Sequence, residues 1–280
     1  MEKRCFNCGR GYPGLFGFGP LLGRFGRYGG FGDLMFWSCG AIYLITVLLN
    51  PEGPLSQRAG LLSMFAPHPA TLFLFGDSGL VPIFGYGRWW TVLSAGFLHG
   101  GILHIYFNLS GLRQLIAEVE NVLGLGRTIL IYTIASVSGF ALTSCVRLGT
   151  AMFFPGIEKT FLRVIAGAEL SVGASAAICG LVGALLAYGQ RTGQFHLQRY
   201  ARNSMIAVLI MGFLLPFIDN WAHVGGFVGG WAATRALRPL EDESPLHLLG
   251  GLICLVLMAA SIVASIVHGL PIYHQMLGQQ

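Results

Sequence analysis

The chain has 280 residues, of which 54% are hydrophobic and only 10% are charged, and its mean hydropathy is +0.66. Soluble domains have about a quarter of their residues charged, so this composition excludes an ordinary soluble protein and indicates an integral membrane protein. The formal net charge is +5, but the basic residues are scattered over the segments between apolar runs. We therefore expect no nucleic-acid binding, because loop charge in a membrane protein mainly reports its orientation.

The N-terminal segment, residues 1–33, combines glycine, aromatic and basic residues without a compact apolar core and cleavage site. This pattern predicts a flexible cytosolic segment and no signal peptide. Cys5 and Cys8 form a C-x-x-C pair within it. A structural zinc site needs four ligands, and no second pair lies in a polar region, so we predict an uncommitted thiol pair, no metal site and no cofactor. A half-site completed by another chain is the alternative.

Seven apolar runs follow, and each is close to the length at which a helix crosses about 30 Å of hydrocarbon. They lie at residues 34–49, 101–117, 128–147, 170–189, 203–218, 220–237 and 248–267. Lys and Arg are concentrated in the N-terminal segment and after the second, fourth and sixth runs, which predicts a cytosolic N-terminus and an external C-terminus. The second, fourth and sixth runs then cross from outside to inside. Without a targeting presequence, a bacterial cytoplasmic membrane is the expected location.

Four polar side chains lie near the outer ends of those three runs. His104 and Asn108 are in the second run, Ser175 is in the fourth and His223 is in the sixth. A polar side chain inside a membrane helix is costly and by default indicates a functional site. Singly, each also fits a structural reading, such as a serine bonded to a backbone carbonyl or a histidine packed in the core. Their common depth on one side favours a shared site.

These residue types fit acyl transfer. A serine hydroxyl is a weak nucleophile unless a base accepts its proton, and histidine is the usual base, so Ser175 and His223 are the predicted nucleophile and general base. His104 and Asn108, four residues apart, share a helix face and can donate hydrogen bonds to the oxyanion of a tetrahedral intermediate. The Ser175 N–H is a third candidate donor. Asp219, four residues before His223, either orients the imidazole or faces water at the helix mouth.

Small residues recur along the two predicted helices that carry Ser175 and His223. Gly180 lies in the fourth run, and Gly226 and Gly230 lie in the sixth. Small residues at this spacing let membrane helices approach closely, and a serine hydroxyl must come within about 3 Å of an imidazole for proton transfer. We expect these three glycines to pack the fourth helix against the sixth.

At these residues the chain resembles the rhomboid family of intramembrane serine proteases, over about residues 85–237. The matching patterns are Gly173-Ala174-Ser175 for G-x-S, His99, His104 and Asn108 for H-x-x-x-x-H-x-x-x-N, and Ala222, His223, Gly225, Gly226 and Gly230 for A-H-x-G-G-x-x-x-G. Three residues depart from those common in the family, namely Thr91, Ala176 and Cys179. None of these three departures removes a nucleophile, a base or an oxyanion donor.

The resemblance implies an all-α membrane protein with a rhomboid-like core of six transmembrane helices at residues 34–237. Residues 238–280 would then be a linker, one additional transmembrane helix and a short C-terminal tail. It also implies a Ser175–His223 dyad that needs no acid, with an oxyanion site made by the second helix. The implied substrates are single-pass transmembrane proteins that are cut at or near the membrane boundary within the lipid bilayer.

Two other readings stay open. An inactive rhomboid-like scaffold would bind transmembrane clients without cutting them, but such relatives typically lose the serine or histidine that this chain keeps. A transporter with a histidine proton relay predicts an inverted repeat and polar residues at the membrane midplane. No repeat is visible, and the polar residues lie nearer one surface. A protease is therefore the leading prediction.

Overall fold

The structure is a computed structural model that describes residues 30–51, 65–215 and 218–278. Cys5, Cys8 and almost all of the N-terminal segment lie outside the described residues, so their flexibility and their free thiols stay predictions. The described chain is helical, as the sequence predicts. Its one β pairing is an isolated antiparallel bridge between Ser78 and Ser171.

Seven helices of 17 residues or more form the body of the described chain. They are α2 (Phe31–Leu48), α5 (Ile102–Leu123), α6 (Leu125–Phe153), α7 (Ser175–Thr192), α8 (Phe195–Leu214), α9 (Asn220–Ala236) and α10 (Pro245–Gly278). The shorter helical segments are α3 (Pro69–Phe75), η3 (Val81–Gly85), α4 (Thr91–Ser94), η4 (Ala95–Phe97), η5 (Ile157–Lys159) and η6 (Phe161–Ile165). Each apolar run of the sequence corresponds to one long helix.

Three of the described helices, α2, α6 and α10, are long and apolar enough to cross a membrane. A fourth crossing results if the bent pair Thr91–Phe97 and Ile102–Leu123 is counted as one span. α7, α8 and α9 are less apolar, because they combine small residues on their packing faces with arginines. Length and composition alone therefore support three or four crossings rather than the expected seven.

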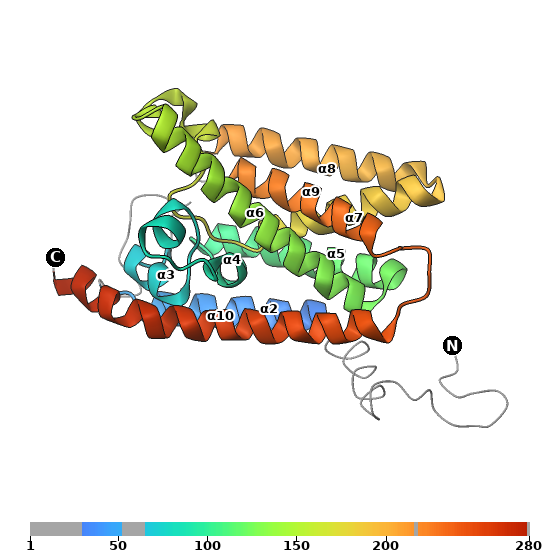
Figure 1. Ribbon diagram of the computed structural model, residues 1–280, viewed down its shortest axis with the longest axis horizontal. Helices are drawn as coiled ribbons and strands as arrows, with labels where there is room; N and C mark the ends of the chain where they lie inside the picture. Colours follow the sequence, from blue (N-terminus) through green and yellow to red (C-terminus); the bar gives the residue numbers. More distant parts are fainter. Residues whose placement is uncertain (1–29, 52–64, 216–217, 279–280) are drawn as a thin grey trace, which may run out of the picture.

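α7 lies at the centre of the bundle. α9 and α6 pack against it, α8 covers another side of α7, and α2 packs on α5. α10 runs along one long edge of the molecule and reaches the short helices α3 and α4 (Figure 1). Its first half packs on α6, so this helix contacts both ends of the bundle.

The contact between α7 and α9 is made backbone to backbone. A Cβ atom at Gly226 would overlap the Ala176 carbonyl, and one at Gly230 would overlap the Gly180 backbone. Gly180 also leaves room for the Ala135 side chain of α6. The absence of side chains lets three helices approach at one level. These glycines therefore lie where the sequence places them, in the interface of the fourth and sixth apolar runs.

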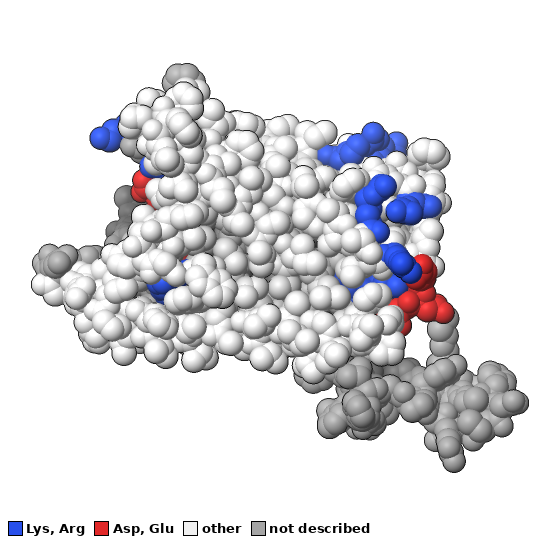
Figure 2. All heavy atoms as spheres, viewed as in Figure 1, with Lys and Arg blue, Asp and Glu red and all other residues white. Residues whose placement is uncertain are grey.

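Charged side chains are unevenly distributed along the bundle. Most of the visible Lys and Arg gather at one end, together with Asp and Glu (Figure 2). Arg191 lies in the last turn of α7 and Arg235 in the last turn of α9, so both helices end there. We call this the basic end. The opposite end, at which α5, α7 and α9 begin, is the serine end.

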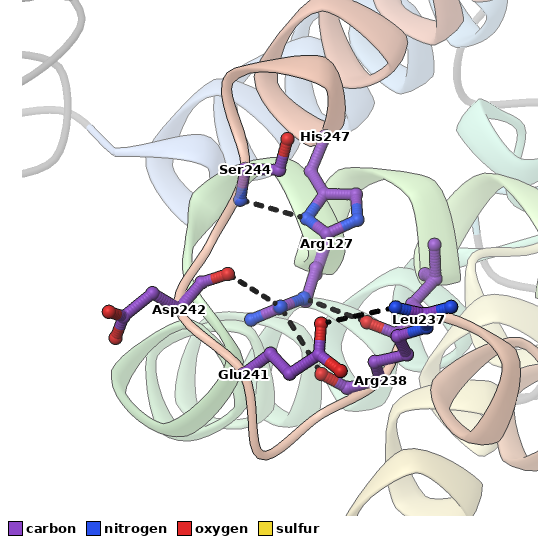
Figure 3. A network of polar contacts seen from close by, with 7 residues as sticks. All are labelled: Arg127, Leu237, Arg238, Glu241, Asp242, Ser244 and His247. Atoms are coloured by element: carbon purple, nitrogen blue, oxygen red, sulfur yellow. Dashed lines mark hydrogen bonds and ion pairs between the residues drawn. The ribbon is translucent and has the colours of Figure 1, made fainter.

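The linker from α9 to α10 is held at the basic end by Arg127, near the start of α6 (Figure 3). Its buried guanidinium donates hydrogen bonds of 3.0–3.2 Å to the carbonyl oxygens of Leu123, Leu237, Arg238 and Asp242. Its backbone N–H donates to the Glu243 carboxylate at 2.9 Å. One residue thus ties the α5–α6 turn to the segment that leads into α10.

Candidate active site

Ser175 is the first residue of α7, and His223 lies in the first turn of α9. Ser175 Oγ and His223 Nε2 are 2.8 Å apart, which is hydrogen-bond distance. The His223 side chain is buried, and its Nδ1 atom has no hydrogen-bond partner among the described residues. A general base takes a proton from a serine hydroxyl in this geometry.

α7 begins five residues later than the apolar run predicts, so the expected helix start at residue 170 is wrong. Ser171 is instead paired with Ser78: the Ser78 N–H donates to the Ser171 carbonyl at 3.0 Å, and the Ser171 N–H donates back at 2.6 Å. Gly173 follows with a φ of +126°, a conformation that side chains disfavour. Ser175 therefore lies at the tip of its helix rather than one turn inside it.

His104 lies on α5 and faces Gly173. Its Nδ1 atom accepts a hydrogen bond of 3.2 Å from the Gly100 N–H, so the ring proton is on Nε2. A Cβ atom at Gly173 would lie 2.7 Å from His104 Nε2 and 3.6 Å from Ser175 Oγ. The space left by this glycine is therefore bordered by an N–H donor and a hydroxyl, as an oxyanion site requires.

Asn108 lies one turn further along α5 and is buried. Its Nδ2 atom donates to the His104 carbonyl at 2.8 Å, a bond within the helix. Its Oδ1 atom has no partner among the described residues. A primary amide carries two N–H groups, so one N–H remains for a ligand.

The chain bends sharply between His99 and His104. The axes of Thr91–Phe97 and Ile102–Leu123 differ by 96°, which is the break that the glycine pair before α5 allows. The two imidazole rings then meet edge to face, with centroids 5.2 Å apart, and His99 is fully buried. His99 thus lies before α5 and packs against His104, and the two histidines do not share one face of a helix.

Asp219 is close to His223 in sequence, but its carboxylate is bonded elsewhere. It accepts hydrogen bonds from Thr143 Oγ1 at 2.9 Å, Ser171 Oγ at 2.8 Å and the Ala222 N–H at 3.1 Å. Burial raises the pKa of Asp219, and these hydrogen bonds oppose the rise. The residue is the N-cap of α9. The structure brings Asp219 to α6 and to residues 168–175, which we call the serine segment. Among the described residues, no hydrogen bond joins its carboxylate to the His223 ring.

The groups that hold the serine segment in place are not evident from the sequence. The Gly173 N–H donates to the Ala95 carbonyl at 3.0 Å, and Thr143 and Ser171 bond to Asp219. A backbone carbonyl leaves no residue-type signal. Thr143 lies 76 residues from its partner, so no local spacing reveals the pair.

The side chains gathered at this site are a serine hydroxyl, two imidazoles and an amide. Within the part of the chain that the structure describes, no group of three or more His, Cys, Asp or Glu side chains could hold a metal ion. Cys179, one turn after Ser175 on α7, is a buried free thiol. The available groups are those of nucleophilic catalysis with a general base.

Residues 86–240, more than half of the chain, match the rhomboid domain, and the chain belongs to the rhomboid family of multi-pass membrane proteins. It is 33% identical over 172 residues to rhomboid protease GluP of Bacillus subtilis (strain 168), covering 60% of this chain and 29% of that protein. It is 27% identical over 208 residues to RHOMBOID-like protein 4 of Arabidopsis thaliana, covering 68% of this chain and 48% of the relative.

A third relative bears on activity. The chain is 26% identical over 192 residues to inactive RHOMBOID-like protein 8 of Arabidopsis thaliana, covering 66% of this chain and 49% of the relative. The chain thus spans less than half the length of these curated relatives. Since the names include both a protease and an inactive protein, membership of the family leaves activity to be argued from the site.

Proposed function

We propose that this chain is an intramembrane serine endopeptidase that cuts single-pass transmembrane proteins at or near the membrane boundary. The observation that carries the proposal is the 2.8 Å contact between Ser175 Oγ and His223 Nε2. The two residues are 48 positions apart and lie on different helices. Two separate helix starts must coincide to make this contact, and the imidazole N–H of a third helix lies beside it.

Acylation would begin when Ser175 Oγ attacks the carbonyl carbon of the scissile peptide bond while His223 Nε2 accepts the hydroxyl proton. The carbonyl oxygen becomes an oxyanion in the space beside Gly173. His104 Nε2–H and the free N–H of Asn108 stabilise it there. When the intermediate collapses, the C–N bond breaks and His223 gives its proton to the leaving amine. The substrate is then an ester of Ser175.

Deacylation reverses these roles with water as the nucleophile. His223 accepts a proton from the attacking water, and the same donors stabilise the second oxyanion. The ester C–O bond then breaks, and His223 returns the proton to Ser175 Oγ. A carboxylic acid product leaves, and the enzyme regains its starting protonation state.

The dyad acts without an acidic third member in this proposal. His223 Nδ1 has no hydrogen-bond partner among the described residues, and Asp219 is occupied by three other donors. The imidazole is held instead by burial at the start of α9. Asp219 therefore enters the proposal as a helix cap.

The membrane arrangement is part of the same proposal. We assign six membrane helices to residues 34–237 and a seventh to α10, with the basic end and the N-terminus in the cytosol of a bacterial cell. The serine end then lies near the external surface, where water can reach Ser175. A peptide bond inside a helix is screened by the helix hydrogen bonds, so substrates with a locally unwound segment are expected.

Labelling by a fluorophosphonate probe tests this function directly, because the probe phosphonylates an activated serine. We expect the full chain in detergent to be labelled, and labelling to fall by about 10⁴-fold or more in Ser175→Ala and His223→Ala. Ser110→Ala is the matched control, since Ser110 is an exposed serine on α5. Cleavage of a single-pass reporter protein in proteoliposomes should follow the same order.

Two results would count against the proposal. Undiminished labelling and cleavage in Ser175→Ala would show that another residue is the nucleophile. A folded wild-type chain that binds single-pass proteins but neither labels nor cuts would favour the scaffold reading.

A further inference from the structure

The last helix, α10, lies outside the matched rhomboid domain but makes buried polar contacts with it. Its buried residues include Met258, Ser261, Ser265 and Gly269, which share one face of the helix. The rest of its surface is largely exposed and apolar. A polar residue such as Ser265, fully buried on a helix of this kind, requires a partner on the protein.

That partner is the first loop, by which we mean residues 65–101. The Arg88 guanidinium is buried, with its carbon 4.2 Å from the centre of the Phe73 ring. It donates to the Phe73 carbonyl at 2.8 Å and to the Ser265 carbonyl of α10 at 2.9 Å. A buried cation needs such acceptors, and α10 supplies one of the two that the Arg88 guanidinium has.

The Ser265 side chain makes a second set of contacts with the same loop. Its Oγ atom accepts from Trp90 Nε1 at 3.2 Å and lies 3.4 Å from Ser94 Oγ. Ser94 in turn donates to the Gly76 carbonyl at 2.8 Å, at the C-cap of α3. The hydroxyl therefore lies between the two halves of the first loop.

One turn further, Gly269 brings α10 against the loop backbone. A Cβ atom there would lie 3.2 Å from Leu74 Cα and 3.3 Å from Arg88 Nη2, so a larger residue must push the helix and the loop apart. Gly278, near the end of the same helix, has nothing within 4 Å of its Cβ position. The two glycines differ in what they contact.

The first loop is also the support of the serine segment. Ser78 and Ser171 exchange two backbone hydrogen bonds, and the Gly173 N–H donates to the Ala95 carbonyl. The Leu80 N–H also donates to the Ala168 carbonyl at 3.1 Å. These contacts set the position of Gly173, which borders the space between His104 and Ser175. A continuous set of contacts therefore runs from α10 to the nucleophile.

We propose that Ser265 and Gly269 of α10 are positioning residues, which hold the first loop and through it the segment that presents Ser175. This inference rests on the proposed function for its effect on catalysis. The support that α10 gives to the first loop is a property of the fold. It can be measured whether or not the chain is active.

The test compares Gly269→Val with Gly278→Val in the full chain, so that the change in residue type within α10 is the same. Hydrogen–deuterium exchange should show the Ser171 and Gly173 amides exchanging about tenfold faster, or more, in Gly269→Val only. The interior of α7 should be unchanged. Fluorophosphonate labelling should slow by about tenfold or more in the same variant. In cleavage of the single-pass reporter protein, kcat should fall more than KM rises, because a misplaced nucleophile affects the chemical step.

Equal exchange of the serine segment in the two variants overturns the proposal. So does a Gly269→Val protein that has a lower unfolding temperature but normal exchange there and normal labelling of the folded fraction. If Gly269→Val does not fold, Ser265→Ala decides, because it keeps the carbonyl bond to Arg88 and loses only the contacts of the hydroxyl. A wild-type chain that is never labelled refutes the proposed function alone. The hydrogen–deuterium exchange comparison still tests whether α10 supports the first loop and the serine segment.

Discussion

Two buried arginines, at opposite ends of the molecule, hold segments that are far apart in the sequence. Arg127 at the basic end donates four guanidinium hydrogen bonds to carbonyl oxygens, whereas Arg88 near the serine end donates two. Arg88 Nε has no hydrogen-bond partner among the described residues, and neither has the carboxyl group of nearby Asp77. Every guanidinium nitrogen of Arg127 thus has an acceptor among the described residues, whereas Arg88 keeps one without.

This difference indicates what each end contributes. Unsatisfied buried polar groups cost free energy of folding, and proteins tolerate such costs mainly where function requires them. Arg127 fixes a turn that is remote from Ser175. Arg88 belongs to the loop that supports the serine segment. We therefore expect changes at Arg127 to affect stability alone, and changes near Arg88 to affect both stability and activity.

The largest effect on stability is expected for Arg127→Met. Four carbonyl oxygens would lose a charged donor, so the free energy of unfolding should fall by about 3 kcal/mol or more. Thermal unfolding in detergent measures the loss. Labelling of the remaining folded protein should keep the wild-type rate, and a tenfold slower rate would contradict the division between the two ends.

Arg88→Met should lower the free energy of unfolding by about 2 kcal/mol, because only two carbonyl oxygens lose their donor. Unlike the change at Arg127, it should also slow fluorophosphonate labelling of folded protein. Arg113→Met is the control, since the Arg113 side chain is 64% exposed and its ion pair with Asp33 should contribute no more than about 1 kcal/mol. Normal labelling of folded Arg88→Met protein would contradict the expectation that Arg88 affects activity as well as stability.

Asp219→Asn tests whether the cap of α9 is also a catalytic acid. The amide keeps an acceptor for the helix N–H but loses the charge, so we expect a loss of about 1 kcal/mol in unfolding free energy. The pH dependence of cleavage should stay at the wild-type position, because the carboxylate has no bond to His223. A shifted profile of kcat/KM against pH would indicate that Asp219 acts on His223 and is a third member of the catalytic site.

The last prediction concerns a pH dependence at Asp77, which is confined to a limited pH range. Burial raises the pKa of Asp77 to about 8, against a partial opposing effect of Arg88. The folded state then holds this proton more tightly than the unfolded state, so the stability it contributes is fully present below about pH 4 and is lost as pH rises through about 8.

Asp77→Asn should therefore lose less stability than wild type between pH 6 and about pH 9. Unfolding temperatures at the two pH values measure the difference, and Asp242→Asn at the exposed basic end is the matched control. An identical pH response in Asp77→Asn and wild type would show that Asp77 does not titrate in this range.

Patterns along the sequence predicted the long helices and the residues that meet at the serine end. Apolar runs report helices because a membrane leaves few alternatives for the backbone, and Ser175, His223, His104 and Asn108 stand out because polar side chains are rare in such runs. The predicted start of α7 was wrong, since an apolar stretch reads the same whether it is helical or bonded to a neighbouring loop. Ser171 is not helical and is hydrogen-bonded to Ser78 of the first loop.

The sequence by itself determined the class of fold, the family and the groups available for chemistry. Only the tertiary structure decided the partners: Asp219 on Thr143 and Ser171, and Arg88 on Ser265 of α10. The physical reason is that periodicity shows which face of a helix is buried, whereas a hydrogen bond across 177 residues depends on how two helices are rotated and spaced.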